Sequence, residues 1–169
     1  MIEPVVIGLG GNIGTSAEIV ERFGHARAAI ATLGAPGGVR SAPLYRSAPI
    51  GPAQAAFLNT AVCIALADGQ PGELIATLLE LERMLGRTRE TEGRWGPRRI
   101  DLDVLVWGAR IIGTPELEVP HPRLAERKFA LAPLVALLGE GFVVPGLATA
   151  GELVRRVASQ ECEEIAATW

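Results

Sequence analysis

The 169-residue chain is 49% hydrophobic and 21% charged, a composition typical of one soluble globular domain, here expected over residues 1–169. Its net charge of −3 gives no indication of nucleic-acid binding, and its length allows a core that needs no disulfide or metal. Residues 1–7 lack a signal-peptide pattern, and no apolar run is long enough to span a membrane. The two cysteines, Cys63 and Cys162, have no metal-ligand spacing and fit a reducing compartment. We therefore expect a cytoplasmic protein.

The first part of the chain is predicted to form three extended segments and one helix. Residues 5–10 make a short apolar strand that ends in glycines. The sequence TSAE at residues 15–18 matches a capping box, and apolar residues follow it at helical spacing. The next extended segment contains Pro43, which favours a position at the edge of a sheet. Residues 57–67 alternate in the manner of a strand with one apolar face.

The second part of the chain contains a long polar loop between two well-defined elements. A helix is expected over residues 70–86, with Pro71 near its start and a glycine at its end. Residues 87–98 have no periodicity, and a loop of this length is usually functional or mobile. The elements expected after it are a strand at 98–107, a hairpin at 108–120, a short apolar helix at 129–138 that Pro133 could interrupt, and a capped amphipathic helix at 149–158.

The order of these elements predicts the fold class. Strand, helix, two strands, helix and strand is the split β-α-β order of the ferredoxin-like fold. We therefore expect an α+β protein with a ferredoxin-like antiparallel sheet, helices packed on one face and a C-terminal extension. The other face of the sheet would be free to bind a ligand.

Two carboxylates interrupt the apolar strand RRIDLDVLVW. Alternation directs Ile100, Leu102, Val104 and Val106 to the core and leaves Asp101 and Asp103 together on the opposite face. Two like charges at this spacing repel each other, and a divalent cation bound by both would relieve the repulsion. A solvated strand face with two ordinary charges is the alternative. The metal site is favoured by composition, because the chain has only three aspartates against 16 glutamates.

Arginines gather immediately before this strand, at positions 87, 89, 94, 98 and 99. A guanidinium group can donate two parallel hydrogen bonds to phosphate oxygens. Arginines beside a pair of acids therefore indicate a polyphosphate bridged by Mg²⁺. Trp95 in the same loop could stack on a planar ring. The alternative is a solvated loop, since the chain has 15 arginines and a single lysine and uses arginine as its ordinary cation.

Other segments carry weaker signals. GLGGNIG lacks the third glycine of a dinucleotide-binding loop and is expected only to turn the chain into its first helix. His121, between two prolines, is either a phosphate contact or a loop residue without a role. Phe57 and Phe129, taken alone, are expected to be core residues.

Taken together, these segments resemble the 6-hydroxymethyl-7,8-dihydropterin pyrophosphokinases of folate biosynthesis. The resemblance runs in family order from Gly8 to Leu131, and its longest and most specific part is RWGPRRIDLD. The other matching segments are GLGGNIG, LYRSAPIGP, FLNTAV, LLELERMLGR and VPHPRL…RKFAL.

The resemblance implies a ferredoxin-like fold and transfer of pyrophosphate from ATP to the pterin alcohol, with release of AMP. It implies two Mg²⁺ ions held by Asp101 and Asp103, and catalytic roles for Arg89, Arg98, Asp101 and Asp103. The residues implied to bind the pterin are Ser47, Ile50, Phe57, Asn59, Trp95 and Phe129. Those implied to bind ATP are Glu82, Arg89, Arg94, Trp95, Arg98, Ile100, His121 and Arg127.

Further expectations concern mechanism and partners. No residue stands out as a general base, so positioning is expected to supply most of the rate, and loops 46–57 and 87–98 could close over the substrates. We expect a monomer that binds small molecules and neither nucleic acid nor membrane. Two alternatives stay open: another Mg²⁺-dependent transferase that uses a nucleotide, and a ferredoxin-like sensor without catalytic activity.

Overall fold

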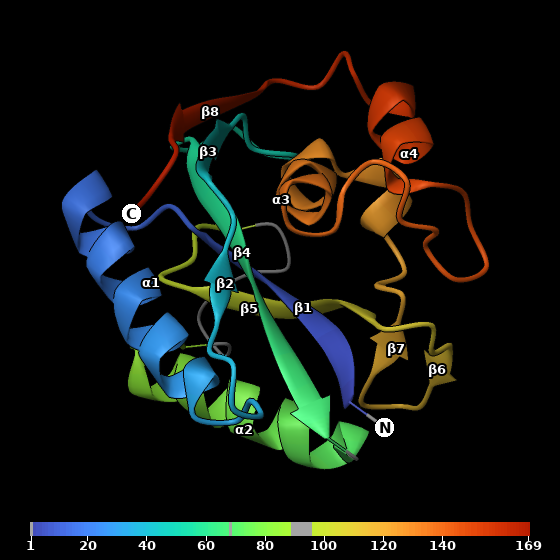
Figure 1. Ribbon diagram of the computed structural model, residues 1–169. Helices are drawn as coiled ribbons and strands as arrows, with labels where there is room; N and C mark the ends of the chain where they lie inside the picture. Colours follow the sequence, from blue (N-terminus) through green and yellow to red (C-terminus); the bar gives the residue numbers. More distant parts are fainter. Residues whose placement is uncertain (1, 68, 89–95) are drawn as a thin grey trace.

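An antiparallel sheet forms the centre of the computed structural model, which describes residues 2–67, 69–88 and 96–169 (Figure 1). Among these residues, six strands join the main sheet, in the order β5-β1-β4-β3-β8 with β2 also paired to β4. The strands are β1 (Ile2–Gly11), β2 (Arg40–Ser41), β3 (Leu44–Ser47), β4 (Phe57–Ala67), β5 (Asp101–Trp107) and β8 (Cys162–Ala166). All the pairings within it are antiparallel, so the predicted α+β class and antiparallel sheet are confirmed.

The other elements are four α-helices, one 3-10 turn and a small hairpin within the described part of the chain. They are α1 (Ser16–Ala31), α2 (Pro71–Met84), η1 (Leu124–Glu126), α3 (Lys128–Leu138), α4 (Ala150–Arg156), β6 (Ile112–Gly113) and β7 (Glu118–Val119). Both predicted capping boxes form, at Thr15 and at Thr149. The helix α3 continues through Pro133 without a break. No helix in the described ranges has the length and apolar character needed to cross a membrane.

Helices α1 and α2 cover one face of the sheet. Apolar side chains of β1, β4 and β5 form a continuous core with them, because each of these elements presents an apolar stripe or face. The largest fully buried residues of this core include Phe23, Ile30, Leu78, Ile100 and Trp107. This is the arrangement expected from the sequence.

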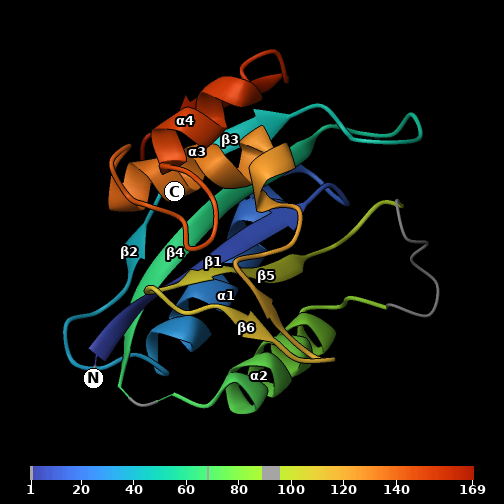
Figure 2. The same ribbon diagram turned by 90° about the vertical axis from the view of Figure 1, so that its right-hand side faces the viewer.

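Helices α3 and α4 lie on the opposite face, which corrects the prediction that helices pack on one face only (Figures 1 and 2). The physical reason is that the second face is also apolar along part of its length, where Val6, Ala61 and Leu105 are buried against α3. The ferredoxin-like description is therefore not confirmed in this detail. The uncovered remainder of this face is the part that holds the polar residues described below.

A β-bulge changes the alternation of β5 partway along the strand. The register of β5 against β1 shifts between Val6 and Ile7, so Leu105 is an extra residue in β5 and the alternation of faces is reversed after it. Val106 therefore joins the core under α3, whereas Trp107 joins the core under α1 and α2. The prediction that Val106 shares a face with Leu102 was wrong, but the faces of Asp101 and Asp103 were predicted correctly, because both precede the bulge.

The C-terminal extension adds an edge strand to the sheet. β8 pairs with β3, and Trp169 beyond it donates from Nε1 to the carbonyl oxygen of Ala42 at 2.8 Å. The indole also meets the ring of Phe23 edge-on at a centroid distance of 6.0 Å, which places the chain end beside α1 (Figure 1). The extension thus closes the margin of the core between α1 and the sheet.

Candidate active site

A cavity of about 340 Å³ opens on the face of the sheet that α3 covers only in part. Asp101 and Asp103 of β5 lie in its wall, together with the glycines of β1 that pair with them. The remaining lining comes mainly from β3, β4, the loop before β4, Gly96 and Arg98 of the segment before β5, and the segment from His121 to α3. Only part of the sheet face that was expected to be free is therefore uncovered, and this part forms a cavity between the polar end of the sheet and α3.

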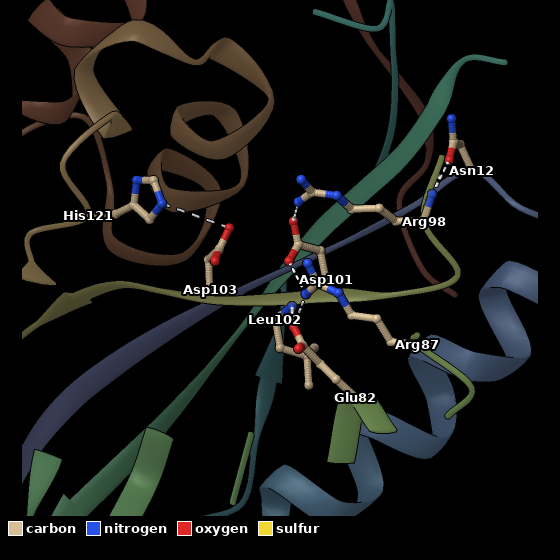
Figure 3. A network of polar contacts seen from close by, with 8 residues as sticks. All are labelled: Asn12, Glu82, Arg87, Arg98, Asp101, Leu102, Asp103 and His121. Carbon is tan, nitrogen blue, oxygen red and sulfur yellow. Dashed lines mark hydrogen bonds and ion pairs between the residues drawn. The ribbon is translucent and has the colours of Figure 1, made fainter. Parts of the chain in front are cut away.

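Asp101 is held by two arginines from different segments (Figure 3). The Arg87 Nη1 lies 2.5 Å from Asp101 Oδ1, and the Arg98 guanidinium donates to the other carboxylate oxygen, Oδ2. Charge-assisted bonds of this kind are the strongest hydrogen bonds in proteins. The two arginines consequently fix the orientation of the carboxylate and engage both of its oxygens.

Arg87 also forms an ion pair with a buried carboxylate of α2. Its Nη1 lies 2.5 Å from Glu82 Oε1, and Glu82 is only 1% exposed. The same oxygen accepts a hydrogen bond from the main-chain N–H of Leu102 at 2.7 Å. A buried charge needs such partners to offset its loss of hydration. Glu82 therefore links the end of α2 to the start of β5 and, through Arg87, to Asp101.

Asp103 has a different environment from Asp101. The imidazole of His121 lies beside it, with Nε2 3.9 Å from Asp103 Oδ2, too far for a direct hydrogen bond (Figure 3). The recessed position of the carboxyl group and the negative charge of Asp101 raise the pKa of Asp103 to about 7. A cation bound at this position would favour its charged form.

His121 is held in a neutral form. Burial and the nearby guanidinium of Arg127 lower the pKa of His121 to about 4. Its Nδ1 accepts a hydrogen bond from the main-chain N–H of Arg123 at 3.1 Å. This bond leaves the proton of the neutral ring on Nε2, which is the nitrogen that faces Asp103.

The donor set suits a hard divalent cation that is completed by a substrate. Two carboxylates project from one strand into the cavity, and within the described residues no group of three or more His, Cys, Asp and Glu side chains could hold a metal. Mg²⁺ binds through one or two carboxylates plus phosphate oxygens and water, so a two-carboxylate site fits it. The structure thus fits an ion that binds together with a polyphosphate.

The far wall of the cavity is apolar with a few buried polar groups. Phe57, Phe129 and Ile50 line it, and Asn59 donates from Nδ2 to the Ser47 hydroxyl at 2.8 Å. Ser47 and Asn59 are 4% exposed, so their hydrogen-bonding groups are fixed by the fold. A flat, partly polar ring matches such a wall. The aromatic side chains can stack on the face of the ring, and the Asn59 amide can bind its edge.

Arg127 lies beside this wall with part of its hydrogen-bonding capacity unused. Its guanidinium carbon is 5.6 Å from the centroid of the Phe129 ring. Among the described residues, no group accepts from its buried Nε. A buried donor without a partner is costly and is expected at a site that binds an acceptor from solution.

A second cavity of about 320 Å³ adjoins the first. Asp103, His121 and Pro122 line both cavities. The second cavity is otherwise formed by α2, β5 and residues 116–118, and Ile75, Leu79 and Leu117 give it apolar surface. Two ligands could therefore bind on either side of Asp103.

The structure brings most of the predicted site residues together. Ser47, Ile50, Phe57, Asn59, Arg98, Asp101, Asp103, His121, Arg127 and Phe129 line the first cavity. Two do not line either cavity: Glu82 is buried behind β5, and the side chain of Ile100 is fully buried in the core. Arg89, Arg94 and Trp95 lie outside the described residues. The predicted closure of loops 46–57 and 87–98 stays a prediction.

Three residues of the site were not singled out from the sequence. Arg87 was noted only as one cation of the loop, and its buried pairing with Glu82 depends on the fold. Arg123, which lines the first cavity, lies in the motif VPHPRL beside His121. Asn12 of GLGGNIG binds the main chain of Arg98, and the signal for it was its place beside a strand end rich in glycine.

Comparison with known proteins identifies the family whose members are similar to this chain in sequence. The family model described as 7,8-dihydro-6-hydroxymethylpterin-pyrophosphokinase (HPPK) matches residues 6–139. The 2-amino-4-hydroxy-6-hydroxymethyldihydropteridine pyrophosphokinase of Bacillus subtilis is 42% identical over 135 residues, which cover 78% of this chain and 75% of that protein. The protein of the same name from Synechocystis is 37% identical over 135 residues, covering 78% of this chain.

Some relatives are longer than this chain. The chain spans 65% of the length of the Synechocystis protein, and 23% of a mitochondrial folate synthesis bifunctional protein of Arabidopsis thaliana that is 42% identical over 139 residues. A crystal structure of Plasmodium falciparum HPPK-DHPS with pteroate aligns with 94% of this chain and 45% of that one, at a TM-score of 0.70. Its sequence is 12% identical, so this likeness shows the fold alone.

Proposed function

The chain belongs to the 7,8-dihydro-6-hydroxymethylpterin-pyrophosphokinase family, and on this premise we propose that it transfers pyrophosphate from ATP to 6-hydroxymethyl-7,8-dihydropterin in folate biosynthesis. The reaction would be Mg²⁺-dependent and would release AMP. The observation that carries the proposal is the pair Asp101 and Asp103, which project from one strand into a cavity between an arginine-lined side and an aromatic side.

The pterin is proposed to bind against the aromatic side. Phe57 and Phe129 offer ring faces, and Asn59 with Ser47 offers buried polar groups for the edge of the heterocycle. Ile50, at 41% exposed, would lose solvent contact when the ring binds. The fixed Asn59–Ser47 pair supports this assignment, because a preformed polar edge lowers the cost of ordering the site.

ATP is proposed to bind on the other side of Asp103. Its triphosphate would contact Arg98, Arg127 and His121. Its base would occupy the second cavity, where Ile75, Leu79 and Leu117 offer apolar surface. Arg89, Arg94 and Trp95 belong to the same proposal through the resemblance. Ile100 could contribute only through its main chain, since its side chain is in the core.

Asp101 and Asp103 are proposed to hold two Mg²⁺ ions, which would supply charge neutralisation at the phosphates. The residues of the chain then do the positioning. Arg87 would fix the orientation of the Asp101 carboxylate, and Arg98 would do so as well before the nucleotide binds. Arg98 would move from this carboxylate toward the phosphates when the nucleotide binds. Arg127 would donate its free Nε to a phosphate oxygen.

In the proposed transfer the hydroxymethyl oxygen attacks the β-phosphorus of ATP. The bond between this phosphorus and the bridging oxygen of the α-phosphate breaks, and AMP leaves with the bonding electrons. The alcohol proton would pass to solvent, because we assign no general base among the described residues that line the cavity. Arginines around the phosphates stabilise the charge that develops on the bridging oxygen.

We also propose that residues 1–169 form a single pyrophosphokinase domain. The protein would be a cytoplasmic monomer without nucleic-acid or membrane partners. Gel filtration with light scattering tests the monomer directly.

The test of function is AMP formation from ATP, Mg²⁺ and 6-hydroxymethyl-7,8-dihydropterin. Wild type should form AMP only with the pterin present, and Asp103→Asn should lose at least roughly 100-fold in rate. Glu21→Gln, which changes a carboxylate that is 73% exposed on α1, is the matched control and should keep full activity. Release of ADP would indicate another nucleotide-dependent transferase, and binding without turnover would indicate a sensor.

A further inference from the structure

Three residues form a row across the polar end of the sheet. Gly10 of β1 pairs with Asp101 of β5 on one side and with Asn59 of β4 on the other. Directly paired residues of an antiparallel sheet point to the same face, and all three of these residues line the first cavity. The floor between the carboxylate and the carboxamide is therefore bare main chain.

The width of this floor suits a short substituent of a bound ring. Neighbouring strands lie about 4.8 Å apart, so the main chains of β5 and β4 are roughly 10 Å apart across Gly10. A ring bound at Asn59 and flanked by Phe57 and Phe129 would have to reach Asp101 over this glycine. The part of the substrate that crosses it is the one-carbon alcohol arm.

Gly10 has little room for even one added carbon. A Cβ at this position would lie 3.1 Å from Oδ1 of Asn59, closer than ordinary van der Waals contact. Asn59 cannot easily move away, because it is 4% exposed and its Nδ2 donates to Ser47 Oγ at 2.8 Å. An added methyl group would therefore displace the carboxamide or stand in the path of the arm.

The next glycine on the same face is less constrained. Gly8 pairs with Asp103 and Ala61, and a Cβ there would meet the side chain of Leu105 at 3.3 Å. The flexible end of a leucine can shift by a few tenths of an ångström. The two glycines of the floor are therefore not equivalent.

We infer that Gly10 is a specificity-determining residue, whose missing side chain leaves the track along which the alcohol arm of the pterin reaches the phosphates. The inference rests on the proposed function and adds to it the surface that separates the two substrates. It predicts that an added methyl group acts on the pterin and leaves the nucleotide site intact.

The experiment compares Gly10→Ala with wild type by calorimetry and by AMP formation. The binding probes are 6-hydroxymethyl-7,8-dihydropterin and a non-hydrolysable ATP analogue with Mg²⁺. Gly10→Ala should weaken pterin binding at least roughly 10-fold and change the affinity for the nucleotide analogue by less than about 2-fold. Gly24→Ala is the control, because Gly24 lies exposed on α1 with no atom within 4 Å of the added carbon, and it should behave as wild type.

Unchanged pterin affinity and rate in Gly10→Ala would overturn the inference, and so would an equal loss of both ligands. If wild type itself binds no pterin, the proposed function fails, which is a distinct result. If Gly10→Ala does not fold, the double variant Gly10→Ala with Asn59→Ser removes the crowded carboxamide. It is compared with Asn59→Ser alone: a further loss of pterin affinity supports the inference, and equal affinities contradict it.

Discussion

Asn12 binds the main chain of Arg98 in both directions. Its main-chain N–H donates to the Arg98 carbonyl at 2.9 Å. Its side-chain Oδ1 accepts from the Arg98 N–H at 2.8 Å (Figure 3). Its Nδ2 donates to Gln54 Oε1 and to the carbonyl of Ala55, each at 3.0 Å. One buried amide thus joins the segment that carries Arg98 to the loop before β4, which forms part of the proposed pterin wall.

Asn12→Ala is expected to lower kcat by at least roughly 10-fold, because the main chain that directs Arg98 toward the phosphates loses its support. It should also cost about 1–3 kcal/mol in the free energy of unfolding, since buried groups lose their partners. Gln54→Ala removes only one of these bonds and should change both quantities less. Steady-state kinetics and urea unfolding measure them, and equal effects of the two variants would contradict the expectation.

The pair of Glu82 and Arg87 predicts a large effect on stability. Arg87→Gln leaves the buried Glu82 carboxylate without this cation, which is expected to cost about 3–5 kcal/mol in the free energy of unfolding. Arg83→Gln is the matched control, because the pair of Arg83 with Glu80 lies on the exposed side of the same helix and should contribute nothing measurable. Both are measured by urea unfolding. A similar small loss in both variants would show that burial does not strengthen the Glu82 pair.

The fold was predictable from the sequence wherever the signal is local. Apolar periodicity identified α1, α2 and β4, and capping residues identified two helix starts. The bulge in β5 was not predictable, since it depends on the pairing with β1. β8 was missed because its residues, CEEIA, form a short edge strand whose polar side chains show little alternation. The predicted position of α3 was wrong, because the sequence of an apolar helix does not indicate which face of a sheet the helix will cover.

The grouping of the candidate site residues was predictable, and the contacts between them were less so. The spacing of Asp101 and Asp103 placed both on one face, as the structure has them. The family resemblance named Phe57 and Phe129, which residue type alone assigned to the core. Contacts between distant segments, such as Asn12 with Arg98, could not be read from the chain because only the folded sheet brings them together.

His121 predicts a loss of stability on the acid side. Because the pKa of His121 is lowered to about 4, its imidazole becomes protonated at a lower pH in the folded protein than in the unfolded chain. The free energy of unfolding should therefore decrease as the pH falls from about 6.5 to about 4. His121→Gln should reduce this decrease, and unfolding in urea at a series of pH values measures it. An identical pH dependence in variant and wild type would show that the imidazole is not held neutral.

Asp101 and Asp103 should affect the stability of the free protein in opposite directions. The pKa of Asp103 is raised to about 7, so the folded state holds its proton more tightly than the unfolded chain, and this group lowers stability as the pH rises from about 4 to about 7. Asp103→Asn should therefore raise the melting temperature at pH 8 and have little effect at pH 4. Asp101→Asn should lower it at pH 8, since Arg87 and Arg98 each lose an ion pair.

The same two variants separate stability from ligand binding. If both carboxylates hold Mg²⁺, each variant should weaken binding of the Mg²⁺ complex of a non-hydrolysable ATP analogue, although one variant is more stable than wild type and the other less. In wild type, the affinity for that complex should rise with pH toward about 7, because the ion binds the charged form of Asp103 and releases its proton. Calorimetry in two buffers of different ionisation enthalpy measures that proton. Binding without proton release near pH 6, or full affinity in Asp103→Asn, would remove Asp103 from the metal site.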